Sequence, residues 1–173
     1  MVPVEGALDA VAVDAAVGLA AGGTRLTESH ATQLRHAAER CAGPVLVASD
    51  ADPAGAAATD RVAGLLGDLD VRAVELPAAC DPAELLAAYG ARGLRRALGR
   101  TRPLVEVVVT DRLARWDRHV GNPVALVEAV HDIAELVVTA PAGLRGRLVG
   151  VITAWTGLPV ETATGALLDD AVG

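Results

Sequence analysis

The sequence predicts an α/β protein in which a central parallel sheet of about four strands is flanked by helices and followed by a small helical tail. Two observations predict this class. Up to Arg102, short apolar runs alternate with longer helical patterns, as they do in strand-helix-strand units. Beyond that point only helical periodicity remains. We therefore expect two parts, residues 1–102 and residues 103–173.

The predicted strands are short, apolar and rich in β-branched residues. Val45–Ser49 is the clearest of them, because it is continuously apolar, as strands buried on both faces of a parallel sheet are. The first two runs are weaker. In chain order the expected strands are Val2–Val4, Val17–Ala21, Val45–Ser49 and Val71–Leu76.

Helices are expected between and after these strands. Thr27 stands where an N-cap is needed, ahead of an amphipathic stretch. Asp52 and Asp81 each precede a proline, which is the usual order of N-cap and first helical residue, and Glu84 stands at the capping-box position. In chain order the expected helices are Ala7–Ala16, Thr27–Arg40, Pro53–Leu66 and Pro82–Tyr89.

The tail is predicted to be helical throughout. The length and apolar spacing of residues 103–117 favour a helix, although Val107–Val109 alone could form a strand. Asn122 as N-cap and Pro123 at the first helical position begin a longer amphipathic helix. Two further short helices are expected at Ala142–Ala154 and Val160–Leu168.

The charge of the chain limits how it can act on nucleic acid. The net charge is −7, and all fifteen basic residues are arginines. A domain that binds nucleic acid by itself usually presents a basic face, because neutralised phosphates supply most of the affinity. No such face is evident, so we expect metal ions or another polypeptide to supply positive charge. Trp116 and Trp155 are expected to anchor the helical core, because stacking sites usually have basic neighbours.

The sequence shows no signal for export or membrane insertion. No apolar run approaches the roughly 20 residues of a membrane span, and no charged-then-apolar leader is present. The two cysteines match neither a zinc pattern nor a disulfide framework. These features favour a cytoplasmic protein.

Acidic residues follow three of the predicted strands. Glu5 follows the first, Asp50 and Asp52 follow the third, and Asp81 comes shortly after the fourth. Ligands of open α/β sheets bind outside the carboxyl ends of the strands, so we expect these residues to share one site. Asp50 and Asp52 can point the same way, because side chains alternate along an extended chain. Clustered carboxylates predict a divalent cation, Mg²⁺ or Mn²⁺, since both prefer oxygen ligands.

Each of these acids also has a purely structural interpretation. Asp52 and Asp81 can cap helices, and Glu5 can interact with a helix dipole. Asp50 is explained least well in this way, because it stands too early to cap and follows a strand that should be buried. The residues alone leave the metal site and the structural roles both open.

Four segments in order resemble the TOPRIM domain of bacterial primases. They are VEGALDAVAV, AAGGTRLTESHATQL, VLVASDADPAGAAA and CDPAELL, and the match extends over residues 2–100. The resemblance implies a Rossmann-like TOPRIM fold. It also implies Mg²⁺- or Mn²⁺-dependent nucleotidyl transfer, in which nucleoside triphosphates are joined into an RNA primer on single-stranded DNA for replication or conjugation.

The resemblance also implies roles for individual residues. Asp50 and Asp52 match the metal-binding aspartate pair of the family, and Asp81 matches a further acidic position. Glu5 matches a residue that completes the metal shell or moves a proton. The remaining matched positions, which support the site or bind nucleotide, are Gly6, Asp9, Gly23, Thr24 and Gly55. Among them, Gly6 and Gly55 are expected to let the backbone turn tightly.

Departures from the family pattern keep two other functions open. Ala83 and Ala56 stand where primases often have an aspartate and a basic residue, and Gly22 replaces a usually apolar position. The zinc-binding and basic parts that precede this domain in primases have no counterpart before Val4, so we expect a basic partner domain or protein. The alternatives are a stand-alone TOPRIM nuclease and a non-catalytic metal- or nucleotide-binding module of a larger DNA-processing protein.

Overall fold

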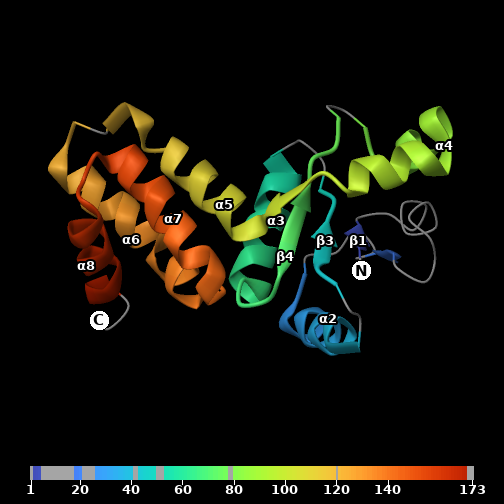
Figure 1. Ribbon diagram of the computed structural model, residues 1–173, viewed down its shortest axis with the longest axis horizontal. Helices are drawn as coiled ribbons and strands as arrows, with labels where there is room; N and C mark the ends of the chain where they lie inside the picture. Colours follow the sequence, from blue (N-terminus) through green and yellow to red (C-terminus); the bar gives the residue numbers. More distant parts are fainter. Residues whose placement is uncertain are drawn as a thin grey trace. The chain divides into compact units, whose positions relative to one another are not determined.

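The computed structural model describes most of the chain, coloured from blue to red in Figure 1. The described residues are 2–4, 18–20, 26–40, 43–49, 53–77, 80–119 and 121–170, with the backbone alone at 2–4, 18–20 and 168–170. The chain divides into two compact units, residues 1–104 and 105–173. The described strands belong to the first unit, and the described part of the second is helical.

The strands of the first unit form two hydrogen-bonded groups. β1 (Val2–Val4) pairs in parallel with β2 (Gly18–Ala20). β3 (Val45–Val47) pairs in parallel with β4 (Val71–Val74), and β4 pairs antiparallel with β5 (Thr101–Pro103). β1 also lies beside β3. The predicted α/β class is confirmed and each predicted strand is present, whereas β5 was not predicted and makes the sheet mixed rather than wholly parallel.

The register explains why β3 and β4 were predicted and β5 was not. Val45 lies opposite Val71, and both side chains are buried, as expected for strands covered on both faces. β5 contains an exposed arginine, Arg102, which lies opposite Ala73, and ends on a buried proline. Proline is tolerated in strands mainly at sheet edges, so this segment has little sequence signal of its own.

Helices α2 (Glu28–Arg40) and α3 (Pro53–Leu66) lie where the sequence predicted them. The Thr27 hydroxyl accepts a hydrogen bond from the His30 backbone N–H at 3.3 Å, which confirms Thr27 as the N-cap of α2. The two helices contact each other. Their buried side chains belong to Ala31, Leu34, Val62, Ala63 and Leu66.

Two arginines join these helices to neighbouring segments. Arg35 donates to both carboxylate oxygens of Asp68, at 2.6 and 2.7 Å, and to the Leu65 carbonyl at 2.7 Å. This hydrogen bonding lowers the pKa of the Asp68 carboxyl and raises the pKa of the Arg35 guanidinium. Arg61 donates to the carbonyl of Leu26, which fixes the segment ahead of α2 against α3.

Helix α4 (Pro82–Leu98) is broken by a kink at Gly90. Gly90 has φ 63° and ψ −178°, a conformation essentially restricted to glycine. The sequence predicted that the helix would end at Tyr89, which is where the first segment ends. The second segment was not predicted, because a glycine at this place is typical of a helix end as well as of a kink.

The second unit is an arrangement of helices. It contains α5 (Leu104–Ala114), the 3₁₀ turn η1 (Asp117–His119), α6 (Pro123–Thr139), α7 (Ala142–Thr156) and α8 (Val160–Asp170). Helices α6, α7 and α8 pack against one another. The helical prediction for the tail is therefore confirmed, and the strand alternative for Val107–Val109 is wrong.

The ends and the core of these helices follow from the sequence. Asn122 caps α6 by accepting the Val124 N–H at 3.0 Å, as predicted. Gly157 ends α7 in the left-handed region, with φ 70°. The fully buried side chains of the unit include Leu113, Ile133, Leu148 and Ile152. Among the helices that the structure describes, none has the length and low charge needed to cross a membrane.

Candidate functional site

The segments that carry the predicted acidic residues begin where two neighbouring strands end. β1 ends at Val4, directly before Glu5, and β3 ends at Val47, three residues before Asp50. Because β1 lies beside β3, the chain enters both segments from adjacent strands of the same unit (Figure 1). This is the part of an α/β fold in which ligand sites are usually found.

Most of the predicted site residues lie outside the described ranges, and their roles stay predictions. These residues are Glu5, Gly6, Asp9, Gly23, Thr24, Asp50 and Asp52. The described chain does contain the neighbours of the aspartate pair, because Ser49 precedes it and Pro53 begins α3 directly after it. Asp81 and Gly55 are fully described.

Asp81 caps helix α4. Its Oδ1 accepts the Glu84 backbone N–H at 2.6 Å, and Glu84 Oε2 accepts the Asp81 backbone N–H at 3.2 Å, which completes a capping box. The structural interpretation of Asp81 is therefore confirmed. The helix-capping bond engages one carboxylate oxygen, and the metal role of Asp81 stays a prediction.

Gly55 lies in the first turn of α3 and is buried. It is not among the described glycines with a positive φ, which are Gly90 and Gly157. The tight turn predicted for Gly55 is therefore wrong, because a helical conformation is open to any residue.

An apolar cluster joins the segment before Asp50 to the start of α4. Ala48, just after β3, is 5% exposed and packs in one cluster with Val74 of β4 and with Leu85 and Leu94 of α4. Cys80, which directly precedes Asp81, packs against the same cluster. The backbone approaching Asp50 and the backbone approaching Asp81 are thus held by a shared set of buried side chains.

A hydroxyl pair fixes the segment after β3 to helix α3. Thr59 donates from Oγ1 to the Ser49 Oγ at 3.0 Å, in a partly buried position. Ser49 directly precedes Asp50, so this bond fixes to α3 the last described residue before the aspartate pair. Sequence reasoning missed both residues, because neither belongs to a recognisable motif and only the packing of α3 on this segment brings them together.

Helix ends, buried clusters and hydroxyl contacts do not by themselves make a metal centre. Among the residues that the structure describes, no group of three His, Cys, Asp or Glu side chains is arranged to hold an ion. The predicted donor set consists of carboxylates alone, which fits a hard divalent cation better than it fits zinc or copper. Three of its four members, Glu5, Asp50 and Asp52, lie outside the described residues, so the site itself stays a prediction.

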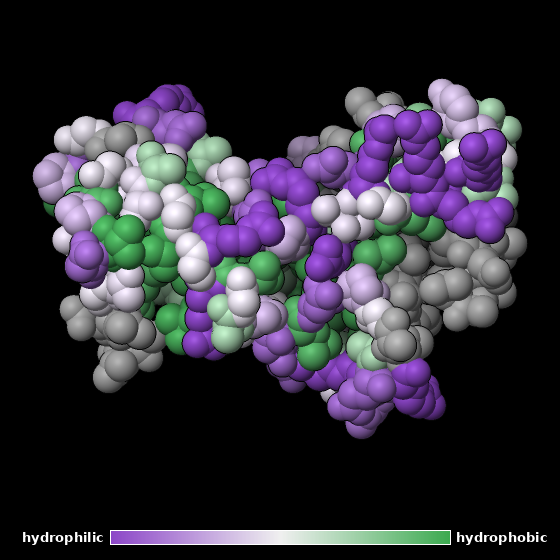
Figure 2. Space-filling view, in the orientation of Figure 1, coloured by the Kyte–Doolittle hydropathy of each residue, from purple (hydrophilic) through white to green (hydrophobic). Residues whose placement is uncertain are grey.

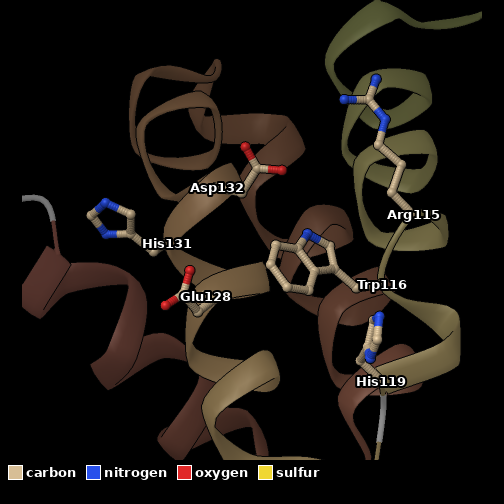
Figure 3. Close-up of a pocket in the computed structure, with 6 residues that line it drawn as sticks. All are labelled: Arg115, Trp116, His119, Glu128, His131 and Asp132. Carbon is tan, nitrogen blue, oxygen red and sulfur yellow. The ribbon is translucent and has the colours of Figure 1, made fainter.

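A separate cavity of about 480 Å³ lies in the second unit (Figure 3). It is lined by Arg115, Trp116, His119, Glu128, His131 and Asp132. Trp116 is partly buried and meets His119 edge-on, with ring centroids 6.4 Å apart, and its role as a core anchor stays a prediction. Basic and acidic groups offset one another around this cavity, and it suggests no particular ligand.

The fold and the placement of the acidic segments define the class of this chain as an α/β protein with a TOPRIM-type sheet. A family model described as Toprim-like matches residues 2–86, which contain β1 to β4 and the start of α4. The resemblance predicted from the sequence is thereby confirmed. No match is found among curated proteins.

Several solved primase structures share the fold of nearly the whole chain. A DNA primase domain from Pseudomonas aeruginosa has a TM-score of 0.72 at 24% identity over 96% of this chain and 53% of its own. The E. coli primase catalytic core has a TM-score of 0.74 at 22% identity, over 92% of this chain and 52% of its own. A DnaG primase catalytic domain bound to ssDNA has a TM-score of 0.72 at 22% identity, over 94% of this chain and 52% of its own. This chain spans about half the length of these structures.

Proposed function

We propose that this chain is the metal-binding half of a primase-type nucleotidyltransferase, with residues 1–102 as the TOPRIM domain and residues 103–173 as its helical tail. It acts in the synthesis of RNA primers on single-stranded DNA, from nucleoside triphosphates, in replication or conjugation. The observation that carries the proposal is the fold shared with primase catalytic cores over more than nine-tenths of the chain.

The predicted carboxylates supply the chemistry of the site. Asp50 and Asp52 bind Mg²⁺ or Mn²⁺, Asp81 contributes from the start of α4, and Glu5 completes the metal shell or moves a proton. When bound, the metal offsets the negative charge of the nucleotide phosphates and of the leaving oxygen. The apolar cluster around Ala48 and the Thr59–Ser49 hydrogen bond fix the segment that leads into the aspartate pair.

A basic partner domain or protein completes the activity. At a net charge of −7 the chain carries too few cations to hold a nucleic acid tightly by itself. We therefore expect the isolated chain to bind single-stranded DNA weakly and to synthesise little or no primer. A basic partner that contacts the template restores synthesis.

Metal binding is tested by thermal unfolding with and without millimolar Mg²⁺ or Mn²⁺. A ligand that binds only the folded state stabilises it by RT ln(1 + [L]/Kd), which is about 1.4 kcal/mol at ten times Kd. Wild type is expected to gain this stability and Asp50→Asn to lose most of the gain. Asp111→Asn removes an exposed carboxylate of α5 and serves as the control. An equal metal response in all three proteins contradicts the site.

Catalysis is tested by primer synthesis from labelled nucleotides on a single-stranded template, with and without basic partners. Glu5→Gln and Asp50→Ala are expected to abolish the activity that a partner restores. Cleavage of the template under the same conditions would favour the nuclease instead. Metal binding without activity under any condition would favour the non-catalytic module, which the capping role of Asp81 and the presence of Ala83 also support.

A further inference from the structure

The segment that runs from the end of the first part of α4 into β5 has a charge opposite to that of the chain. Residues 89–102, which we call the arginine segment, contain five of the fifteen arginines and no acidic residue. The chain as a whole has a net charge of −7, and this segment alone carries +5. The arginines are Arg92, Arg95, Arg96, Arg100 and Arg102.

These side chains are presented to solvent. All five arginines are exposed, and hydrophilic side chains gather over α4 in Figure 2. Arg92 and Arg96 are one helical turn apart and therefore share a face of α4. Arg95 donates through Nε to the Ala91 carbonyl at 3.2 Å. Within the described ranges, Arg92, Arg95, Arg96 and Arg100 form no ion pair with a carboxylate.

An exposed aromatic ring stands at the start of the same segment. Tyr89 is 68% exposed, which is unusual for a large aromatic side chain. It is also one of only three aromatic residues (Phe, Trp, Tyr) in the sequence. Two glycines fix it there. Gly90 supplies the kink, and a Cβ at Gly93 would come within 2.3 Å of the Tyr89 Cβ, so a larger residue at position 93 would displace the tyrosine. The arginine segment thus begins with an exposed ring whose Cβ packs against Gly93.

We propose that the arginine segment is a binding surface for single-stranded nucleic acid. The guanidinium groups of Arg92, Arg95, Arg96 and Arg100 contact successive phosphates, because their planar donors match phosphate oxygens. The Tyr89 ring stacks on an unpaired base, and a combination of cations with an exposed aromatic ring is typical of single-strand binding. A duplex offers no unpaired base to such a ring, so single strands bind more tightly.

Two described acidic residues flank the arginine segment without pairing with its helical arginines. Glu84 lies in the first turn of α4, before the kink, and its carboxylate accepts the Asp81 N–H. Glu75 lies after β4, where its backbone N–H bonds to the Arg100 carbonyl at 2.9 Å. Glu84 therefore lies toward the Tyr89 end and Glu75 toward the Arg100 end, and neither forms an ion pair with Arg92, Arg95 or Arg96 in the described structure.

The inference extends the proposed function, because it assigns a weak template contact to this chain rather than to its partner. The test is fluorescence anisotropy of labelled oligothymidylate with the full 173-residue chain at several salt concentrations. Four phosphate contacts predict a slope of log K against log salt of about −2.8. The double variant Arg92→Ala/Arg96→Ala is expected to halve this slope, to about −1.4, and to weaken binding by about tenfold or more at low salt.

Matched variants separate this surface from general charge effects. Arg40→Ala/Arg118→Ala removes two exposed arginines elsewhere and is expected to change affinity by less than about twofold. Tyr89→Ala is expected to weaken binding by about fivefold or more, whereas Tyr89→Phe keeps the ring and the affinity. Equal losses in both double variants overturn the proposal. Competition by polyglutamate as strong as that by oligothymidylate, with no effect of Tyr89→Ala, overturns it in favour of an acidic polypeptide ligand.

The same variants distinguish this surface from the metal site. Asp50→Asn is expected to abolish the metal-dependent stabilisation and to leave the salt slope of DNA binding unchanged. If the arginine variants bind DNA like wild type while Asp50→Asn still abolishes metal binding, the arginine segment is not the surface and the proposed function stands. If the arginine variants lose binding while metal has no effect on wild type, the surface is supported and the metal centre is not.

Discussion

Asp81 has two roles assigned to it, and a pair of substitutions separates them. Asparagine caps helices about as well as aspartate does, but it is a much poorer ligand for Mg²⁺ because it lacks the negative charge. Alanine can serve neither purpose. We therefore expect Asp81→Asn to keep the cap, with only a small loss of stability in the metal-free protein, and to lose metal-dependent stabilisation. Asp81→Ala is expected to lose both the cap and the metal response.

The geometry of the capping box sets the size of the effect. The Asp81 Oδ1 lies 2.6 Å from the Glu84 N, and the next residue, Leu85, is 3% exposed, so the first turn of α4 is fixed in the core. Loss of such a cap costs about 1 kcal/mol. For a chain of this size that corresponds to a fall in melting temperature of about 2–4 °C for Asp81→Ala. Asp81→Asn loses only the interaction with the helix dipole, about 0.3–1 kcal/mol.

The assay is thermal unfolding of wild type, both Asp81 variants and Asp111→Asn, without metal and at millimolar Mg²⁺. If Asp81 is a ligand, the Mg²⁺-induced rise in melting temperature is reduced in both variants and kept in Asp111→Asn. A full metal response in Asp81→Asn would show that Asp81 is a helix cap alone. A metal-free melting temperature of Asp81→Ala equal to that of wild type would refute the reasoning about the cap.

Further substitutions test the described fold. Asp68→Asn is expected to lower the free energy of unfolding by up to about 1 kcal/mol at pH 7, a small amount because the pair with Arg35 is partly exposed. Folding lowers the pKa of Asp68, so the pair stabilises the protein above the unfolded pKa of about 3.9. The difference between wild type and Asp68→Asn should therefore vanish when denaturation is measured at lower pH. Gly90→Ala should lower the free energy of unfolding by about 1–3 kcal/mol in denaturant titrations, because of its backbone conformation and although no atom lies within 4 Å of the new Cβ. Gly157→Asn, in the left-handed region that asparagine tolerates, should lower it little. Ile152→Val should cost about 0.5–1.5 kcal/mol by loss of a buried methylene, and a smaller loss would mean that α7 packs less tightly than described.

Features specified by a few adjacent residues could be predicted from the sequence. Thr27 and Asn122 cap their helices as expected, because a cap depends on a side chain and an N–H two or three residues later. The buried strands β3 and β4 were evident from continuous apolar residues. In such places local preference and tertiary structure agree, so the local signal is sufficient.

Features that depend on distant partners could not be predicted. β5 has three residues and becomes a strand only because β4 offers an unpaired edge. The helical segment after Gly90 follows a glycine that marks a helix end and a kink equally well, and the packing of Leu94 in the cluster around Ala48 decides between them. The Ser49–Thr59 contact likewise exists only once α3 lies against the segment after β3.

The candidate site shows the same division. The sequence predicted that the four acidic residues follow strand ends. β1 and β3, which lie side by side, end shortly before Glu5 and Asp50, in agreement with that prediction. A sequence motif cannot distinguish a capping role from a metal-binding role of the same residue. An aspartate before a proline is a good cap wherever a helix follows, so the capping by Asp81 leaves its metal role to be decided by the substitutions above.

Net charge is an average, and it conceals the arginine segment. Charges that lie more than about 10 Å apart are largely screened at 0.1 M salt, so acidic residues beyond that distance offset the arginines of α4 only weakly. Arg92, Arg95 and Arg96 lie within five residues of helix, about 6 Å along its axis, and therefore form a dense positive patch on an acidic protein. A patch of this size can position one strand without holding it tightly, since affinity rises with the number of phosphates neutralised. The two proposals, a basic partner and a template contact on this chain, are thus compatible, because the affinity for a strand and the path of that strand can be set by different surfaces.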